Sequence, residues 1–510
     1  MCVELERIMN GFWWTGSSGK GIRWKDWNNL STPKKGGGLG FKRLREFNLA
    51  MLGKQSWRIF TKPHCLVVKV LKARYFPRSS FLEAKIGHNP SFIWRSILET
   101  QSLIKEGYRW RVGRGDSINV WDDPWLPCLD NPRVESQLVQ GLEGCKVAGL
   151  LQRDGGGGWD VDIVNDIFGN RDRELILGIP VSQRHVPDKL VWRWEENGSY
   201  SVKSSYKFLM QSSGNVSSYG WTRMWNLPIP PKVKFFFWQA CIGCLPTADT
   251  LMTKRQVWGL MNWSFQLDAS ISFEMWVERL LNNHNEERCS KFIMLIWGLW
   301  NARNTILWQQ VYTPPQSIVA GALTFLEGWQ QAQGTNRKSQ NQLQTTVRWV
   351  KPDEGRVKIN TDAAVKTGSG SMGLGWIARS SEGEFIVGGA INRTGVFLPR
   401  EAEALAVREA LSWLKEAGWD HIDLETDSLQ LIKSIQSGED ESSFGVIVGD
   451  IRELSTSFND ITFAHVRRSA NRAAHDMAKA ADSMSGCHIW FSFPPDCISA
   501  SLNHDYINTS

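Results

Sequence analysis

Residues 400–418 read REAEALAVREALSWLKEAG, and this stretch is strongly periodic. The positions at +4, +7, +8 and +11 from Glu403 are Val407, Ala410, Leu411 and Leu414. This spacing predicts an amphipathic helix whose apolar stripe faces a sheet. Glu403 lies on the same stripe. Because a half-buried carboxylate is costly unless it is paired or binds a cation, Glu403 is a candidate functional residue.

The sequence on both sides of this helix predicts a mixed α/β layer fold. Strands are expected at 356–363, 374–379, 384–391, 421–426 and 461–466, a turn at 368–373, and further helices at 427–436, 446–458 and 471–483. Three strands, a helix, a strand, helices, a strand and a helix form such a fold. We therefore expect a five-stranded mixed sheet with flanking helices in the C-terminal part, and a mainly α-helical N-terminal part with short strands.

Two further acidic residues are expected where strands end. Asp362 closes VKINTD, and Asp427 closes IDLETD and also starts a helix. Ligand sites in open α/β sheets collect at strand ends. Each residue also has a structural interpretation, since Asp362 could be a turn residue and Asp427 could cap the following helix. Glu403 could likewise point off the edge of its stripe.

The charge distribution suggests one part that binds a polyanion and another that holds cations. Residues 1–130 contain 22 Lys+Arg and 11 Asp+Glu, a net charge of +11, whereas residues 347–485 contain 16 and 21, a net charge of −5. The alternative is that the basic residues only keep a surface soluble. The 27 Trp residues could serve either a core or base stacking.

Cysteine usage and hydropathy bear on the compartment. The nine Cys are odd in number and scattered, which favours reduced thiols over a disulfide framework. The N-terminus lacks the apolar core of a signal peptide, and no apolar run approaches the roughly 20 residues of a membrane span. We expect an intracellular protein of the nucleus or cytoplasm that is not secreted and has no membrane partner.

The C-terminal pattern resembles the type 1 ribonuclease H fold, in the form that accompanies plant non-LTR retroelements. The resemblance covers about 140 residues. It rests on WxKP (Trp349, Lys351, Pro352), KINTDAA, AEALAxxEAL, LETDS and HVRRSANRAAHDMAKAA. It implies that the chain cuts the RNA strand of RNA–DNA hybrids with Mg²⁺ or Mn²⁺ as cofactor.

The resemblance also assigns roles to individual residues. It implies that Asp362, Glu403 and Asp427 bind two metal ions, one activating water and the other stabilising the leaving 3′-oxygen. His465 would assist product release or proton transfer, because it precedes the helix-opening Asn471 by six residues as in the family. The family's fourth carboxylate position is His475 here; a neutral His can still ligate a metal or hold a metal-bound water, so we expect a weakened or altered metal dependence, with His475 in the catalytic set. Asp476 cannot simply take over, since it is turned about 100° around the helix.

Recognition of the hybrid is expected to involve polar residues near strand and helix ends. The candidates are Asn360, Thr361, Ser428 and Asn471, and each could equally be an ordinary capping or strand-end residue. The family's basic protrusion is missing, because residues 437–443 read SGEDESS and are acidic. The Arg- and Trp-rich segment upstream could supply nucleic-acid binding instead.

The upstream sequence resembles other parts of the same elements. Residues 1–130 are similar to the region that follows the polymerase core, although no YxDD motif is present. Residues 190–265 resemble a partial zinc-binding domain that lacks its ligands. Cys241 and Cys244 form a CxxC with no second pair near it, so no zinc is expected.

The remaining expected divisions are a helical connector at 266–329, a polar linker at 330–346, the ribonuclease H domain at 347–485 and a tail at 486–510.

Three functional hypotheses follow. The first is a metal-dependent endonuclease acting on RNA–DNA hybrids, favoured because all three acidic residues are present. The second is a catalytically inactive, retroelement-derived protein that binds nucleic acid. The third, transposase or integrase chemistry on the same fold, is less favoured because a helix of the AEALA type after three strands fits the ribonuclease arrangement better.

Overall fold

The computed structural model describes residues 1–16, 22–152, 158–182, 184–211, 220–245, 273–338, 348–366, 370–437 and 440–507. The chain divides into two compact units. Unit 1 combines residues 1–49 and 209–344, and unit 2 combines residues 50–208 and 345–510. Within the described ranges, no helix is both long and apolar enough to cross a membrane.

Unit 1 is helical, as expected for the N-terminal part. Its helices are α1 (Cys2–Thr15), α2 (Trp27–Ser31), α10 (Trp221–Asn226), α11 (Pro231–Cys241), α14 (Phe273–Asn283), α15 (Glu286–Gln309) and α16 (Pro315–Lys338). They share an apolar core that includes Phe237, Phe292 and Leu295. Helix α16 continues to Lys338, into the stretch expected to be a polar linker, and the rest of that stretch lies outside the described residues.

The upstream part of unit 2 is mainly helical with one short two-stranded sheet. Its helices are α3 (Leu44–Thr61), which begins in unit 1, α4 (Leu66–Tyr75), α5 (Phe92–Leu98), α6 (Gln101–Gly107), α7 (Val161–Ile167), α8 (Asn170–Leu177) and α9 (Val202–Gln211). Strands β1 (Tyr108–Arg111) and β2 (Lys189–Trp192) pair antiparallel.

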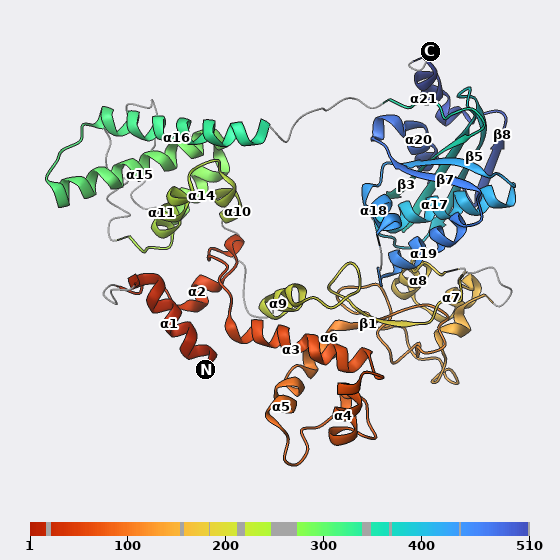
Figure 1. Ribbon diagram of the computed structural model, residues 1–510, viewed down its shortest axis with the longest axis horizontal. Helices are drawn as coiled ribbons and strands as arrows, with labels where there is room; N and C mark the ends of the chain where they lie inside the picture. Colours follow the sequence, from red (N-terminus) through yellow and green to blue (C-terminus); the bar gives the residue numbers. More distant parts are fainter. Residues whose placement is uncertain are drawn as a thin grey trace. The chain divides into compact units, whose positions relative to one another are not determined.

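The C-terminal part of unit 2 is a six-stranded mixed sheet (Figure 1). Its strands are β3 (Val357–Lys366), β4 (Ser371–Arg379), β5 (Phe385–Thr394), β6 (His421–Thr426), β7 (Asp460–His465) and β8 (Cys487–Phe491). They lie in the order β7-β6-β3-β4-β5-β8. The pairs β3/β6 and β6/β7 are parallel, and the other neighbours are antiparallel.

Helices cover both faces of this sheet. Helices α17 (Pro399–Glu416), α18 (Leu429–Gln436) and α19 (Ser443–Ser455) share the larger apolar core with one face. Helices α20 (Arg472–Ala481) and α21 (Asp496–Ile507) pack on the other. At Gly375 a Cβ atom would lie 2.3 Å from the backbone nitrogen of Ala478, so only glycine lets α20 approach β4 this closely.

Several expected boundaries differ from the structure. The sheet has six strands rather than five, because residues 486–510, expected to be a tail, provide β8 and α21. Strand β3 continues four residues beyond Asp362, so this aspartate lies within the strand and not at its end. Helix α18 is capped by the Ser428 side chain, so Asp427 is not its N-cap.

Within unit 2, the segment around residues 174–200 packs against helices α17 and α19. Asp450 of α19 is buried and accepts hydrogen bonds from Ser182 Oγ at 2.6 Å and Arg184 Nε at 2.7 Å. Arg408 of α17 donates to the Val181 carbonyl at 3.0 Å. Upstream sequence and the six-stranded sheet therefore form one packed unit.

Candidate active site

Asp362 is buried in the middle of β3. It lies opposite Gly375 of β4, and its carboxylate accepts a hydrogen bond from the Ala363 backbone N–H at 2.8 Å. Only 3% of its surface is exposed. Because the alternation of a strand directs every second side chain to one face, this position aims the carboxylate out of the sheet.

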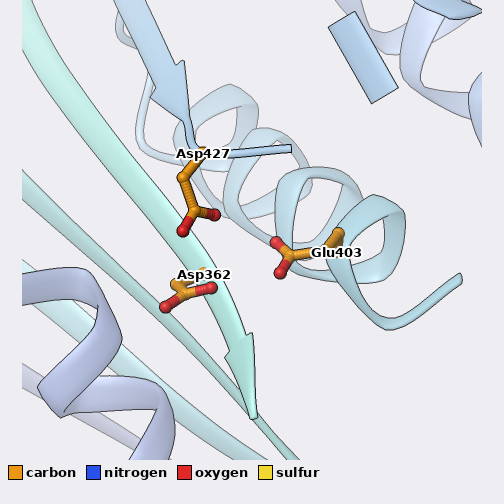
Figure 2. A group of neighbouring side chains, drawn as sticks. All are labelled: Asp362, Glu403 and Asp427. Atoms are coloured by element: carbon orange, nitrogen blue, oxygen red, sulfur yellow. The ribbon is translucent and has the colours of Figure 1, made fainter. Parts of the chain in front are cut away.

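Two other elements bring carboxylates to Asp362. Strand β6 runs parallel to β3 with Thr426 opposite Thr361, which places Asp427 beside Asp362. Glu403 projects from the first turns of α17. One oxygen from each of the three carboxylates lies within 4.8 Å of the others, and Figure 2 shows the groups pointing toward one another. The three acidic residues singled out in the sequence thus form one cluster.

The protonation of this cluster reflects burial and mutual repulsion. Burial, followed by the negative charges of Asp362 and Asp427, raises the pKa of Glu403 to about 10. The pKa of Asp427 is also raised, first by burial and then by Asp362. Without a cation, Glu403 therefore holds a proton at neutral pH. Its Oε2 is buried without a hydrogen-bond partner among the described atoms.

Helix α20 contributes His475 at the position of the family's fourth carboxylate. Its Nδ1 lies 2.7 Å from Asp362 Oδ2. An Arg468 guanidinium nitrogen lies 3.1 Å from His475 Nδ1 and 3.2 Å from Nε2. The positive charge of Arg468 opposes the upward pKa shifts of Glu403 and Asp427. Arg468 was missed in the sequence, where it is one of two adjacent arginines with no periodicity to distinguish it.

Asp476 faces away from the cluster. Its carboxylate accepts a hydrogen bond from Ser501 of α21. The turn of the helix therefore separates Asp476 from its neighbour His475, as the sequence predicts.

The expected hybrid-recognition residues are mostly internal. Asn360, Thr361 and Asn471 are at most 1% exposed. Asn360 accepts from Trp349 Nε1 at 3.0 Å and donates to Glu425 at 2.9 Å, while Asn471 donates to the Thr361 carbonyl at 2.9 Å. The Asn360 and Asn471 side chains connect β3, β6 and α20, and none of the three residues faces solvent, which corrects the expectation that they contact nucleic acid. Ser428 caps α18 and is partly exposed.

His465 is the last residue of β7 and is exposed. It pairs with Thr426, the last residue of the parallel strand β6. His465 and Asp427 therefore both lie at the carboxyl ends of neighbouring strands. The His465 side chain is accessible to solvent.

The segment expected to resemble a zinc-binding domain provides no second ligand pair in its described part. Cys241 and Cys244 are both buried and form no disulfide, and burial raises the pKa of the Cys244 thiol to about 11. Residues 246–272, where further ligands would be sought, lie outside the described residues.

Comparisons with known proteins agree with this geometry. Residues 360–481 match a family described as reverse transcriptase-like, and residues 200–260 match one described as zinc-binding in reverse transcriptase. A putative ribonuclease H protein of Arabidopsis thaliana is 23% identical in an alignment of 573 positions, which covers 99% of this chain and 88% of that protein. Ribonuclease HI of Halobacterium salinarum is 30% identical over 135 residues, 26% of this chain and 67% of that enzyme. The chain belongs to the retroelement-derived ribonuclease H proteins.

A solved structure is similar over the same share of the chain. The crystal structure of ribonuclease H1 from Halobacterium salinarum is 28% identical, covers 25% of this chain and 97% of its own, and has a TM-score of 0.24. The carboxylate cluster of Asp362, Glu403 and Asp427 lies inside the residues matched by the reverse transcriptase-like family. Residues 360–481, together with β8 and α21, are called the ribonuclease H domain below.

Proposed function

We propose that this protein is a metal-dependent endonuclease that cuts the RNA strand of RNA–DNA hybrids. The observation that carries the proposal is the convergence of Asp362, Glu403 and Asp427 from three separate elements, with donor oxygens within 4.8 Å. Membership of the ribonuclease H proteins supports the reaction class. A purely structural role for three mutually repelling carboxylates, one buried and two half-buried, would be costly, since none of them neutralises another.

The donor set fits a hard divalent cation. Carboxylate oxygens are the ligands that Mg²⁺ and Mn²⁺ prefer, and Glu403 Oε2 is a buried acceptor with no other partner in the described part of the chain. Asp362, Glu403 and Asp427 would hold the metal. When bound, divalent ions supply an activated water and stabilise the charge of the leaving 3′-oxygen.

His475 and Arg468 act through the acidic residues. His475 fixes one oxygen of Asp362 by the 2.7 Å contact and so orients the carboxylate. Arg468 contributes positive charge beside the cluster, where a phosphodiester would approach. His465, exposed at the end of β7, would exchange a proton with solvent and assist product release.

Cleavage of a hybrid labelled on its RNA strand tests the proposal directly. The full chain is incubated with Mg²⁺ and, separately, Mn²⁺, beside an Asp362→Asn variant. Outer-shell changes at metal sites typically cost 10–100-fold, so loss of a metal ligand should lower the rate by at least about 100-fold. The RNA strand should be cut and the DNA strand left intact.

The contrary result is also specific. If a folded protein cuts no hybrid with either metal, the endonuclease proposal fails and a binding role is left. The His475→Asp variant then tests whether the fourth position is what prevents catalysis, because it restores an oxygen ligand.

A further inference from the structure

A groove of about 730 Å³ lies in the upstream part of unit 2. Helix α3, strands β1 and β2, and residues 199–200 form most of its walls. Its lining includes Lys54, Arg58, Lys62, Trp110, Lys189 and Tyr200. Its volume is within the range that ligand sites commonly have. None of these residues belongs to the carboxylate cluster.

Three cations follow one side of the groove. Lys54, Arg58 and Lys62 are four residues apart along α3 and just beyond its end, so they share one helix face with a spacing of about 6 Å. All three are exposed. Within the described residues, the Lys54 and Lys62 side chains make no hydrogen bond or ion pair, and the Arg58 guanidinium donates only to the thiol of Cys65.

The acidic residues of the groove do not neutralise this row. The Asp188 carboxylate accepts three backbone N–H groups, from Gly113, Gly115 and Ser117, each at 2.8 Å. Glu441 pairs with Lys189 at 2.8 Å. The lining therefore has a net charge of +2, from four cations against Asp188 and Glu441, and this charge attracts a polyanion.

Aromatic side chains form the apolar part of the groove. Trp57 stacks on Tyr200 with ring centroids 6.2 Å apart, and Phe60 and Trp110 are partly exposed. Burial raises the pKa of Tyr200 to about 12, so its hydroxyl remains neutral and donates to the Ala50 carbonyl at 2.7 Å. Aromatic faces beside cations are what an unpaired nucleic-acid strand uses, since its bases are free to stack.

The groove borders the ribonuclease H domain at Glu441. This residue also donates its backbone N–H to the Asn197 carbonyl at 3.0 Å. It follows α18, whose first residue is two positions after Asp427 and whose eight residues span about 12 Å. Asp427 of the cluster and Glu441 of the groove are therefore 14 residues apart in the chain, with α18 between them.

We infer that this groove binds an unpaired nucleic-acid strand that extends from the hybrid at the carboxylate cluster. The inference rests on the proposed ribonuclease function, and it defines the substrate class as hybrids with a single-stranded extension. Lys54, Arg58 and Lys62 contact the phosphates, and Trp110 offers a face to a base. A paired duplex has no free base for that face.

Binding can be measured without cleavage. The full-chain Asp362→Asn protein, in metal-free buffer, is titrated into a fluorescently labelled single strand of about 15 nucleotides, and anisotropy is recorded at several salt concentrations. Replacing Lys54, Arg58 and Lys62 together with alanine should weaken binding at least tenfold and lower the slope of log K against log salt by about 2. Trp110→Ala should weaken binding about tenfold with an unchanged slope.

The matched control removes the same charge from the neighbouring helix. Lys69, Lys72 and Arg74 are exposed on α4 and do not line the groove, so their triple alanine variant should bind almost as the parent does. The inference would be contradicted if both triple variants lost the same affinity for the single strand. It would also be contradicted if the parent bound a polyglutamate peptide as tightly as the single strand. Because no metal or cleavage is involved, a failure here is distinct from a failure of the ribonuclease proposal.

The same variants then report on the substrate in the active protein. At low substrate concentration, the triple alanine variant of Lys54, Arg58 and Lys62 should cut a hybrid with a single-stranded extension more slowly than the parent. It should cut a blunt hybrid at the parental rate. An equal effect on both hybrids would contradict the assignment of the groove to the extension.

Discussion

At the scale of single residues, the site depends on the cost of burying Glu403. Its stripe position makes it part of the helix face that packs on the sheet, and the neighbouring Asp362 and Asp427 oppose its ionisation. The unfavourable desolvation and repulsion free energy of the three carboxylates is relieved only when a cation or a proton neutralises the cluster. Stability and metal binding are therefore linked through one side chain.

Glu403→Gln should change the dependence of stability on pH. The folded state holds the Glu403 proton up to about pH 10, while the unfolded chain releases it near 4.5. Stability of the metal-free parent therefore falls as pH rises between these values, by up to about 1.4 kcal/mol per pH unit. The variant should lose this dependence and be the more stable protein at pH 8, as measured by urea unfolding.

The control for this variant is on the same helix. Glu416→Gln changes an exposed residue at the end of α17 and should leave the pH dependence as in the parent. Mg²⁺ should stabilise the parent and the Glu416 variant at pH 8, and stabilise the Glu403 variant much less. A parental pH profile in Glu403→Gln would contradict the burial argument.

At the scale of elements, the C-terminal residues complete the ribonuclease H domain. Strand β8 pairs with β5, and α21 packs on α20. The buried carboxylate of Asp505 on α21 accepts a hydrogen bond from Arg379 of β4 at 2.8 Å. Arg379 also donates to Asn360 at 2.8 Å and lies over the Trp349 ring, so α21 is connected to the strand that carries Asp362.

Asp505→Ala should destabilise this domain strongly. Removing one partner of a buried pair leaves Arg379 charged and uncompensated, which costs about 3–5 kcal/mol. Asn503→Ala, on the exposed side of the same helix, should cost less than about 0.5 kcal/mol. Equal unfolding midpoints for the two variants in a denaturant titration would show that α21 is not part of the cooperative fold.

At the scale of the whole molecule, upstream sequence and the ribonuclease H domain pack together in unit 2. Asp450 is 2% exposed and accepts from Arg184 and Ser182, while Arg408 reaches the Val181 carbonyl. The N-terminus of α17 is held in the same way, since Arg400 donates to the Glu196 carbonyl at 2.7 Å. Glu403 is less than one helical turn from that contact, so the upstream segment supports the active-site helix.

Arg184→Ala should loosen this packing, because it leaves the buried Asp450 with fewer partners. Hydrogen exchange should increase in residues 174–200 and in α19, and remain unchanged in β3 and β4. Arg114→Ala is the matched control, since Arg114 is exposed and pairs only with the exposed Asp116 in the described structure. Unchanged exchange in Arg184→Ala would mean that the contact contributes nothing to the packing.

Local sequence pattern determined most elements of the ribonuclease H domain and its three acidic residues. Strand β6 begins and ends at the expected residues, and α17 and α20 differ from expectation by only one or two residues at each end. Periodicity and chain order are local properties, so one sequence is enough to read them. Glu403 stood out for the same reason, as an acidic residue on an apolar stripe.

Only the tertiary structure decided which side chains meet. Strand β3 runs past Asp362 because β4 pairs with it along its whole length, and Asn360 and Asn471 are internal because β6 and α20 close over them. The approach of His475 to Asp362 depends on α20 lying directly on Gly375, and β8 joins the sheet by pairing with β5. Burial and contact between residues distant in sequence depend on the register and packing of whole elements, which local periodicity does not encode.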